Sequence, residues 1–156
     1  MIIKKREKDK KLVFILIVVC IFISAIFICN NNQYKDRNYN DYMYEFYEIY
    51  FQIAETIDNI SSKDIKILRE SENQQEINEL NTILMAMEND IPKNKKSNYN
   101  KLNNWYIELV ELSDEKYENW WELTIEERRK AYTQMVIIRL RLVDWQDNKS
   151  GIAWEK

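Results

Sequence analysis

The chain has 156 residues, with 23 Lys and Arg against 26 Asp and Glu, and it contains no histidine. Without histidine, Ser–His and Cys–His nucleophile systems and the common histidine-containing zinc sites are excluded. The only cysteines, Cys20 and Cys29, lie in one apolar run, so the rest of the chain cannot form a disulfide. One glycine and one proline favour a few long helices over a turn-rich β fold.

An uncharged apolar run occupies residues 12–29 (LVFILIVVCIFISAIFIC). A helix of this length spans about 27 Å, close to the hydrocarbon core of a bilayer. Six basic residues precede it, and such positive flanks stay in the cytoplasm. We therefore predict a cytoplasmic basic tail (1–11), a transmembrane signal anchor (12–29) and a single-pass protein of the cell membrane. Everything after Cys29 is then extracytoplasmic.

Two alternatives to an uncleaved anchor stay open. A cleaved secretory signal is disfavoured because the run is longer than usual and ends without an A-x-A pattern. A lipoprotein anchor at Cys29 needs small residues before the cysteine, and Phe27 and Ile28 are bulky. The core helix of a soluble protein is excluded because the run is apolar on every face.

Beyond Cys29 the sequence carries 17 Lys and Arg against 24 Asp and Glu, a net charge of about −7. This charge argues against nucleic acid as a partner and, by the same reasoning, against acidic lipid surfaces. The absence of disulfides outside the apolar run is compatible with a bacterial envelope protein. Heavy use of Asn, Ile and Lys suggests a low-GC bacterium, or one of its phages or plasmids, as the source.

Residues 30–38 are polar and predict a linker or a frayed helix end. A heptad-like apolar stripe then predicts the first helix of an extracytoplasmic domain at 39–147. The stripe steps by four and three residues through Tyr39, Met43, Phe46, Tyr50, Ile53, Ile57 and Ile60. Ser61 and Ser62 are expected to end this helix and to cap the next.

The second predicted helix runs from Ile65 to Ile91 and is interrupted by the polar stretch 69–76. It ends before Pro92, which disfavours helical backbone at the preceding residue. A third helix is predicted from its stripe of Leu102, Trp105, Leu109 and Leu112. Between residues 113 and 123 the pattern drifts, which fits either one curved helix or a long helix followed by a short one.

Thr124 and Glu127 form a capping-box sequence that predicts the start of the last helix. Its buried stripe is expected to comprise Ala131, Met135, Ile138, Leu142 and Trp145, widened by Val136, Ile137, Leu140 and Val143. On this reading it is the most buried helix, and residues 148–156 form a tail. The predicted fold is all-α, with a single transmembrane helix followed by an extracytoplasmic bundle of three to four antiparallel helices with coiled-coil spacing.

Acidic residues form two rows at helical spacing. The first comprises Glu108, Glu111, Glu115, Glu118 and Glu122, and the second comprises Asp41, Glu45, Glu48 and Glu55. Paired carboxylates can cleave glycosides, but a row of acids along one helix is typical of a solvated face. We predict no catalytic residue, no cofactor and no metal site. Arg139 and Arg141 flank the buried stripe and are expected to pair with acids of these rows.

Aromatic residues exceed what the predicted core can bury. Helical positions one and two apart do not face together, so neighbouring aromatics cannot all point inward. The partner-binding candidates are Tyr42, Tyr44, Tyr47, Trp120 and Trp121. Tyrosine and tryptophan are common at protein interfaces, while tyrosine also gathers near lipid headgroups. Ordinary packing is the third interpretation.

The layout of basic tail, membrane helix and external helices resembles that of small bitopic division or envelope-assembly proteins. We therefore predict a membrane-anchored extracytoplasmic interaction module, not an enzyme, in envelope assembly or division of a low-GC bacterium. Its partner is another membrane or envelope protein, or a second copy. One alternative is an immunity or exclusion protein of a mobile element. The other is a carboxylate-dependent cell-wall glycan hydrolase.

Overall fold

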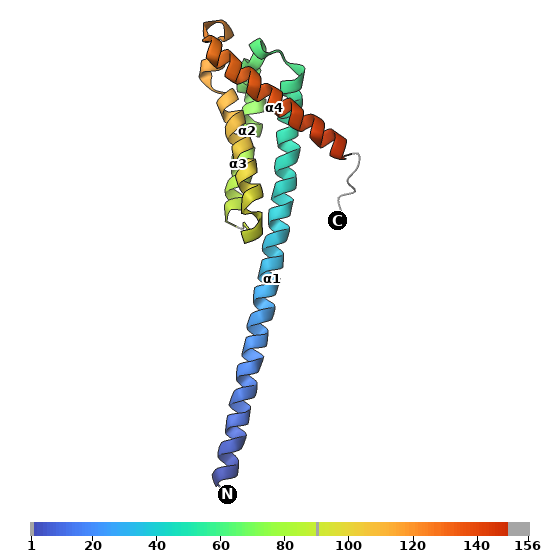
Figure 1. Cartoon of the computed structure of the whole chain (residues 1–156). Coiled ribbons are helices and arrows are strands. Elements are labelled where there is room, and N and C mark those ends of the chain that lie inside the picture. Colours follow the sequence, from blue (N-terminus) through green and yellow to red (C-terminus); the bar gives the residue numbers. More distant parts are fainter. Residues whose placement is uncertain (1, 90, 150–156) are drawn as a thin grey trace.

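The structure, a computed structural model, describes the backbone of residues 2–89 and 91–149 and the side chains of residues 17–89 and 91–148. Over these residues the chain is all-helical and contains no strand (Figure 1). The side chains of the predicted basic tail and the C-terminal residues from 150 onward lie outside the described part. The predicted α class is therefore confirmed where the structure can test it.

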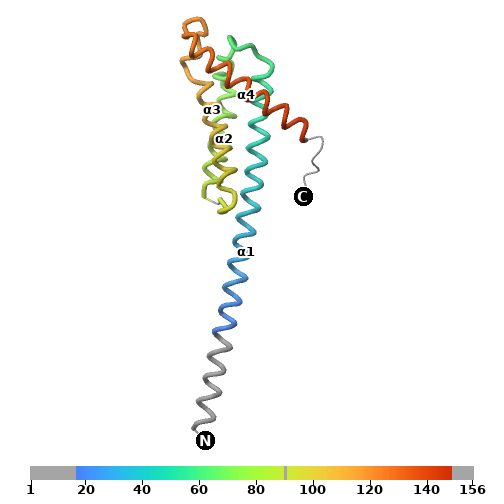
Figure 2. Tube along the Cα trace, in the orientation of Figure 1, coloured from blue at the N-terminus to red at the C-terminus, as the bar shows by residue number. Residues whose placement is uncertain are grey.

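Helix α1 is one continuous α-helix from Ile2 to Asn59 (Figures 1 and 2). The side chains of residues 17–34 are all exposed, and this part of the helix projects away from the other elements. Within the described residues, α1 alone is long and apolar enough to cross a membrane. Residues 30–38, for which the sequence predicts a linker or a frayed helix end, are helical and continue α1 without a break.

From Tyr39 onward α1 carries the core of the protein. The predicted stripe is fully buried at Tyr39, Phe46, Tyr50, Ile53 and Ile57, whereas Met43 and Ile60 are half-buried. The structure packs α2 (Ser71–Glu88) and α4 (Ile125–Lys149) against this part of α1. Helix α3 (Lys96–Leu112) in turn contacts α2. We call this packed part of the chain the helical domain.

The segment between α1 and α2 is a 3-10 helix, η1 (Ser62–Arg69), and not the start of an α-helix as we expected. The polar stretch that follows explains the break. The side-chain amides of Asn73 and Gln74 donate to the carbonyl oxygens of Ile67 at 2.9 Å and Leu68 at 2.8 Å. The Ile67 carbonyl also accepts the backbone amide of Glu70 at 3.1 Å, so side chains of the polar stretch and the backbone together bind the carbonyl groups at the end of η1.

Helix α2 ends before Pro92, as predicted. A short turn, η2 (Lys93–Lys95), leads into α3 (Lys96–Leu112). Two further 3-10 turns, η3 (Glu115–Tyr117) and η4 (Trp120–Glu122), connect α3 to α4. Residues 113–123, where the sequence pattern drifts, therefore contain two single 3-10 turns that follow the long helix α3.

The capping box at the start of α4 is confirmed. The Thr124 hydroxyl accepts a hydrogen bond from the Glu127 amide at 3.2 Å, and the Glu127 carboxylate accepts one from the Thr124 amide at 2.8 Å. Helix α4 then crosses the helical domain over the ends of α1 and α3 (Figure 1).

Candidate interaction surfaces

Helix α4 has two apolar faces, and the helical domain covers only one of them. The inward face consists of Ala131, Met135, Ile138 and Leu142, all buried, with Trp145 half-buried. On a second face, about 120° around the helix axis, the exposed fractions are 76% for Ile125, 55% for Tyr132, 60% for Leu140 and 51% for Val143. We call these four residues the outer face of α4.

The prediction that further apolar residues of α4 widen its buried stripe is therefore wrong. Ile137, Leu140 and Val143 are exposed and Val136 is half-buried, so they do not widen the buried stripe. Helix α4 is accordingly not the most buried helix. The reason is geometric: in a helix of about 3.6 residues per turn, residues 132, 136, 140 and 143 point about 120° around the helix axis from the buried residues 131, 135, 138 and 142.

The two adjacent tryptophans of η4 have different environments. Trp120 is half-buried and packs against the core, whereas Trp121 is 72% exposed. The Trp121 carbonyl oxygen accepts a hydrogen bond from Arg128 Nη2 at 3.3 Å, which holds the turn against the start of α4. Of the two candidates, Trp121 is thus the one available for contact, at the end of the domain opposite to the free part of α1.

The three candidate tyrosines of α1 also separate. Tyr42 and Tyr47 are half-buried and pack against the core. Tyr44 is 45% exposed. Its hydroxyl interacts with the Glu48 carboxylate one turn later, and this interaction raises the pKa of Tyr44. Tyr44 is therefore the most accessible of the three.

Tyr47 belongs to an aromatic cluster that the folding brings together from α1, α3 and α4. The ring centroids of Tyr47 and Trp145 are 5.4 Å apart, and those of Phe51 and Trp145 are 4.6 Å apart. Trp105 of α3 completes the cluster at 6.0 Å from Tyr47. A cleft of about 310 Å³ opens beside these rings, with Lys101 also in its wall. Its lining suits an apolar or aromatic side chain.

A half-buried ion pair between Arg141 and Glu108 lies at this cleft, with Arg141 in its wall. Arg141 Nη2 donates to Glu108 Oε1 at 3.1 Å, Nη1 donates to the other carboxylate oxygen, and Nη1 also bonds the Tyr50 hydroxyl at 3.0 Å. The guanidinium lies 4.7 Å from the centroid of the Trp105 ring. Burial raises the pKa of Tyr50 to about 12, although Arg141 opposes this shift. The predicted pairing of Arg141 with an acid of the first row is confirmed.

The first acidic row does not form one continuous face. Glu108 binds Arg141, while Glu111 contacts Lys130 at 2.9 Å and Gln134 at 2.8 Å. Hydrogen bonds from these two side chains lower the pKa of Glu111. The remaining acids of the row fall in or beside the 3-10 turns after α3, and Glu118 pairs there with Arg69 at 2.7 Å. The carboxylates thus serve different structural contacts.

Arg139 binds backbone carbonyl groups at the C-terminal end of α1. The expectation that it pairs with an acid of the two rows is wrong. Its ion-pair partner is Asp58, at 3.6 Å. Its Nη2 donates to the carbonyl oxygens of Ile57 at 2.8 Å and Ile60 at 2.6 Å. These carbonyl groups belong to the last turn of α1, where a cation is favourable.

No known protein family, curated protein or solved structure matches this chain. Among the described residues, no group of three or more His, Cys, Asp or Glu side chains is placed to hold a metal ion.

Proposed function

We propose that this protein is a membrane-anchored interaction module. Residues 12–29 of α1 form the transmembrane anchor, the basic tail stays in the cytoplasm, and the helical domain is an extracytoplasmic bundle of antiparallel helices. The apolar length of α1 and the six basic residues before it support this arrangement. The process we favour is envelope assembly or division in a low-GC bacterium.

The outer face of α4 is the single observation that carries the proposal. Its four apolar side chains are between 51% and 76% exposed, although the core beneath α4 is already filled. Large exposed apolar patches mark sites of protein contact, because association removes that surface from water. The partner is another membrane or envelope protein, or a second copy of the chain. The function of the protein is to bind this partner through the outer face of α4.

Site-specific photo-crosslinking in the native cells tests this proposal. A photoreactive amino acid at position 140 of the full-length chain should give one discrete adduct, whose mass identifies the partner. The same probe at Asn78, which is exposed on α2 away from the outer face, is the matched control and should give none. Leu140→Gln, with the probe moved to position 143, should lower the yield of the adduct at least several-fold.

Trp121 provides a second arm of the same experiment. If the contact extends over η4, Trp121→Ala should also lower the yield of the adduct while leaving the helical content unchanged. A probe at position 140 that gives only the diffuse background seen with the probe at position 78 contradicts the proposed contact function.

A topology reporter tests the orientation separately. A fusion partner that is active only outside the cytoplasm, joined after Lys156, should be active in cells. An inactive external reporter together with an active cytoplasmic one contradicts the orientation. A mature protein that begins with a lipidated Cys29 shows instead that the anchor is a lipoprotein anchor.

A further inference from the structure

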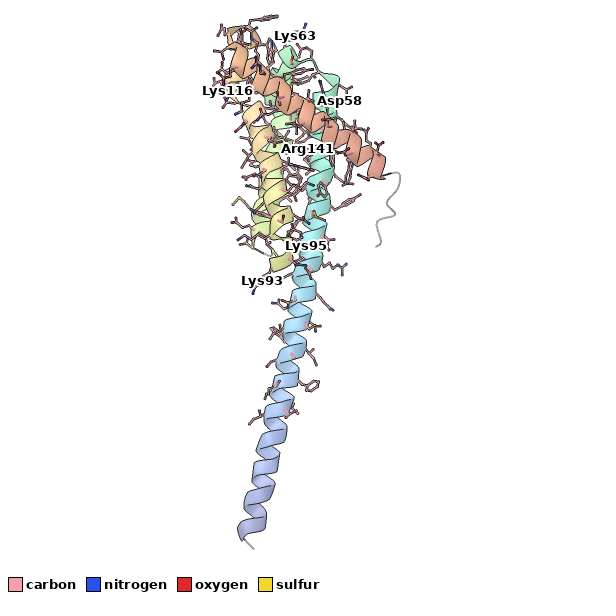
Figure 3. All side chains as sticks on the ribbon, viewed as in Figure 1. Asp58, Lys63, Lys93, Lys95, Lys116 and Arg141 are labelled. Atoms are coloured by element: carbon pink, nitrogen blue, oxygen red, sulfur yellow. The ribbon has the colours of Figure 1, made fainter. Side chains whose placement is uncertain are left out.

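The end of the helical domain that faces the free half of α1 is built from two segments far apart in sequence. The turn after Pro92 lies against α1, and a hollow there is lined by Asn32, Lys35 and Lys93 among others. The Tyr39 hydroxyl donates to the carbonyl oxygen of Lys95 at 3.3 Å, which fixes the turn at this height. Figure 3 shows Lys93 and Lys95 at this end and Lys63 and Lys116 at the opposite end.

This end carries the opposite charge to the rest of the domain. Five basic residues lie in segments 30–37 and 88–96: Lys35, Arg37, Lys93, Lys95 and Lys96. We call them the basic collar. With Asp36, Glu88 and Asp90 counted against them, these segments have a net charge of +2. The other residues after Cys29 carry 12 basic and 21 acidic side chains, a net charge of −9.

The collar lies close to the expected surface of the bilayer. Because α1 is continuous, each residue beyond Cys29 adds about 1.5 Å along its axis. Lys35 is then about 9 Å beyond the last apolar residue, just past a headgroup layer of about 5–7 Å on each side. Tyr34, 64% exposed, lies at the same height, where tyrosine commonly contacts headgroups.

The collar is also accessible. Lys93, Lys96 and Arg37 are exposed, and within the described residues none of them has a carboxylate in salt-bridge distance. Lys95 is half-buried. The side chains of Arg37, Lys93 and Lys96 therefore remain available to an external anion.

We propose that the basic collar rests on anionic phospholipid headgroups of the membrane that α1 crosses, and so fixes the height and tilt of the helical domain. This inference rests on the membrane anchoring of the proposed function. It also revises our argument from net charge. Screening limits the field of a charge to about 8 Å at physiological salt, so the local charge at the collar decides the contact. The rest of the domain, which is acidic overall, extends well beyond that range, to the far end marked by Asp58 and Lys63 in Figure 3.

Lysine acylation in nanodiscs measures this contact within one molecule. The full-length protein is placed in discs of phosphatidylcholine alone or with about one-third phosphatidylglycerol and is treated with an uncharged acylating reagent. Mass spectrometry then measures the rate at which each lysine is acylated. An anionic surface at −30 to −50 mV concentrates protons about 3- to 7-fold, which slows acylation of a nearby amine by the same factor. Lys93, Lys95 and Lys96 should slow in anionic discs, whereas Lys63, Lys66 and Lys116 should not.

Salt and free phosphate separate the lipid surface from other anions. The slowing should disappear at 1 M salt, where the screening length is about 3 Å. Inorganic phosphate added to phosphatidylcholine discs at constant ionic strength should have no effect. Equal slowing by free phosphate overturns the proposal in favour of a soluble-anion site, and equal rates in both kinds of disc overturn it outright.

Matched charge variants test whether the contact holds the domain. For the wild-type chain the melting temperature should be about 5 °C higher in anionic discs. The triple variant Lys93→Gln, Lys95→Gln, Lys96→Gln should lose this difference, and the distal variant Lys63→Gln, Lys66→Gln, Lys116→Gln should keep it. If both triple variants lose it equally, the collar has no special role and the inference is wrong.

Two further controls keep the outcomes distinct. Should the collar triple variant lose helical content in phosphatidylcholine discs, the exposed single variant Lys93→Gln replaces it and should lose part of the difference. A chain that does not remain in any disc contradicts membrane anchoring, and with it the proposed function. A chain that remains in the discs but shows no lipid dependence contradicts only the collar.

Discussion

Helix α1 divides near residue 38 into two halves that differ in how their apolar residues are arranged. In residues 17–29 apolar side chains are exposed around the whole helix, whereas from Tyr39 to Ile57 they form a buried stripe on one side. The first pattern suits lipid, which surrounds a helix, and the second suits a protein core, which covers one face. Both halves of α1 have the same helical conformation, and only the distribution of their apolar side chains distinguishes them.

The polar residues between the halves remain helical for a physical reason. Extending an existing helix costs little, because each added residue gains one hydrogen bond, whereas starting a helix is costly. The packed half supplies a formed helix at Tyr39, so residues 30–38 need no stabilising contacts of their own. The predictions below test how independent the two halves are.

The largest effect should come from placing a charge in the buried stripe. Ile53 is fully buried, so Ile53→Asp would bury an unpaired carboxylate and should lower the free energy of unfolding by about 4 kcal/mol. Urea unfolding of the full-length protein in micelles measures this. Ile23→Asn, in the exposed half, is the control and should leave unfolding of the helical domain unchanged. Wild-type stability for Ile53→Asp would show that the stripe is not core.

Alkaline pH should weaken the packed half through Tyr50. Burial raises the pKa of Tyr50 from 10.0 to about 12, with Arg141 opposing, so the unfolded chain ionises first as the pH rises. The stability from the neutral phenol is complete below pH 10 and is lost between about pH 10 and 12, to a total of about 2–3 kcal/mol. Unfolding of Tyr50→Phe should depend less on pH over that interval. Identical pH profiles would contradict the assignment.

A smaller loss is expected where α4 holds the end of α1. Arg139→Gln removes charge-assisted hydrogen bonds to the carbonyl oxygens of Ile57 and Ile60, which should cost about 1–2 kcal/mol. Arg129→Gln, at an exposed position of the same helix, is the matched control and should cost less than about 0.5 kcal/mol. Equal effects for the two variants would mean that Arg139 does not hold the end of α1.

The smallest effect should arise between the two halves. Asn32→Gly lowers helix propensity by about 0.4 kcal/mol, so amide hydrogen exchange over residues 30–38 should quicken about twofold. Exchange over residues 46–57 should stay unchanged, because packing protects that part of the helix. A variant that loosens the buried half as well would show that the two halves are not independent.

Local and periodic features of the fold could be predicted from the sequence. The stripe of α1, the stop before Pro92 and the capping box at Thr124 depend on residues within one or two turns of each other. In each of these cases a short stretch of chain contains the whole physical cause. The rule that a buried charge needs a partner predicted that Arg139 and Arg141 pair with acids of the two rows, which is confirmed for Arg141 and wrong for Arg139.

The features that the sequence did not predict depend on what covers a face. Periodicity predicted the buried stripe of α4 through Met135 correctly, but it could not show that the domain leaves Leu140 and Val143 uncovered. The aromatic cluster joins Tyr47 to Trp145, and the collar joins Lys35 to Lys93. These neighbours are distant in sequence, so their proximity cannot be read from local patterns. The overall net charge likewise hides the difference between the basic collar and the acidic rest of the domain.

The continuity of α1 has a mechanical consequence. From Cys29 to Asn59 the helix is about 45 Å long, at 1.5 Å per residue, and no hinge interrupts it. On the proposed membrane anchoring, a change of about 10° in the tilt of α1 would displace its far end sideways by about 8 Å. Because bilayer thickness influences helix tilt, the anchoring would then couple local membrane geometry to the position of α4.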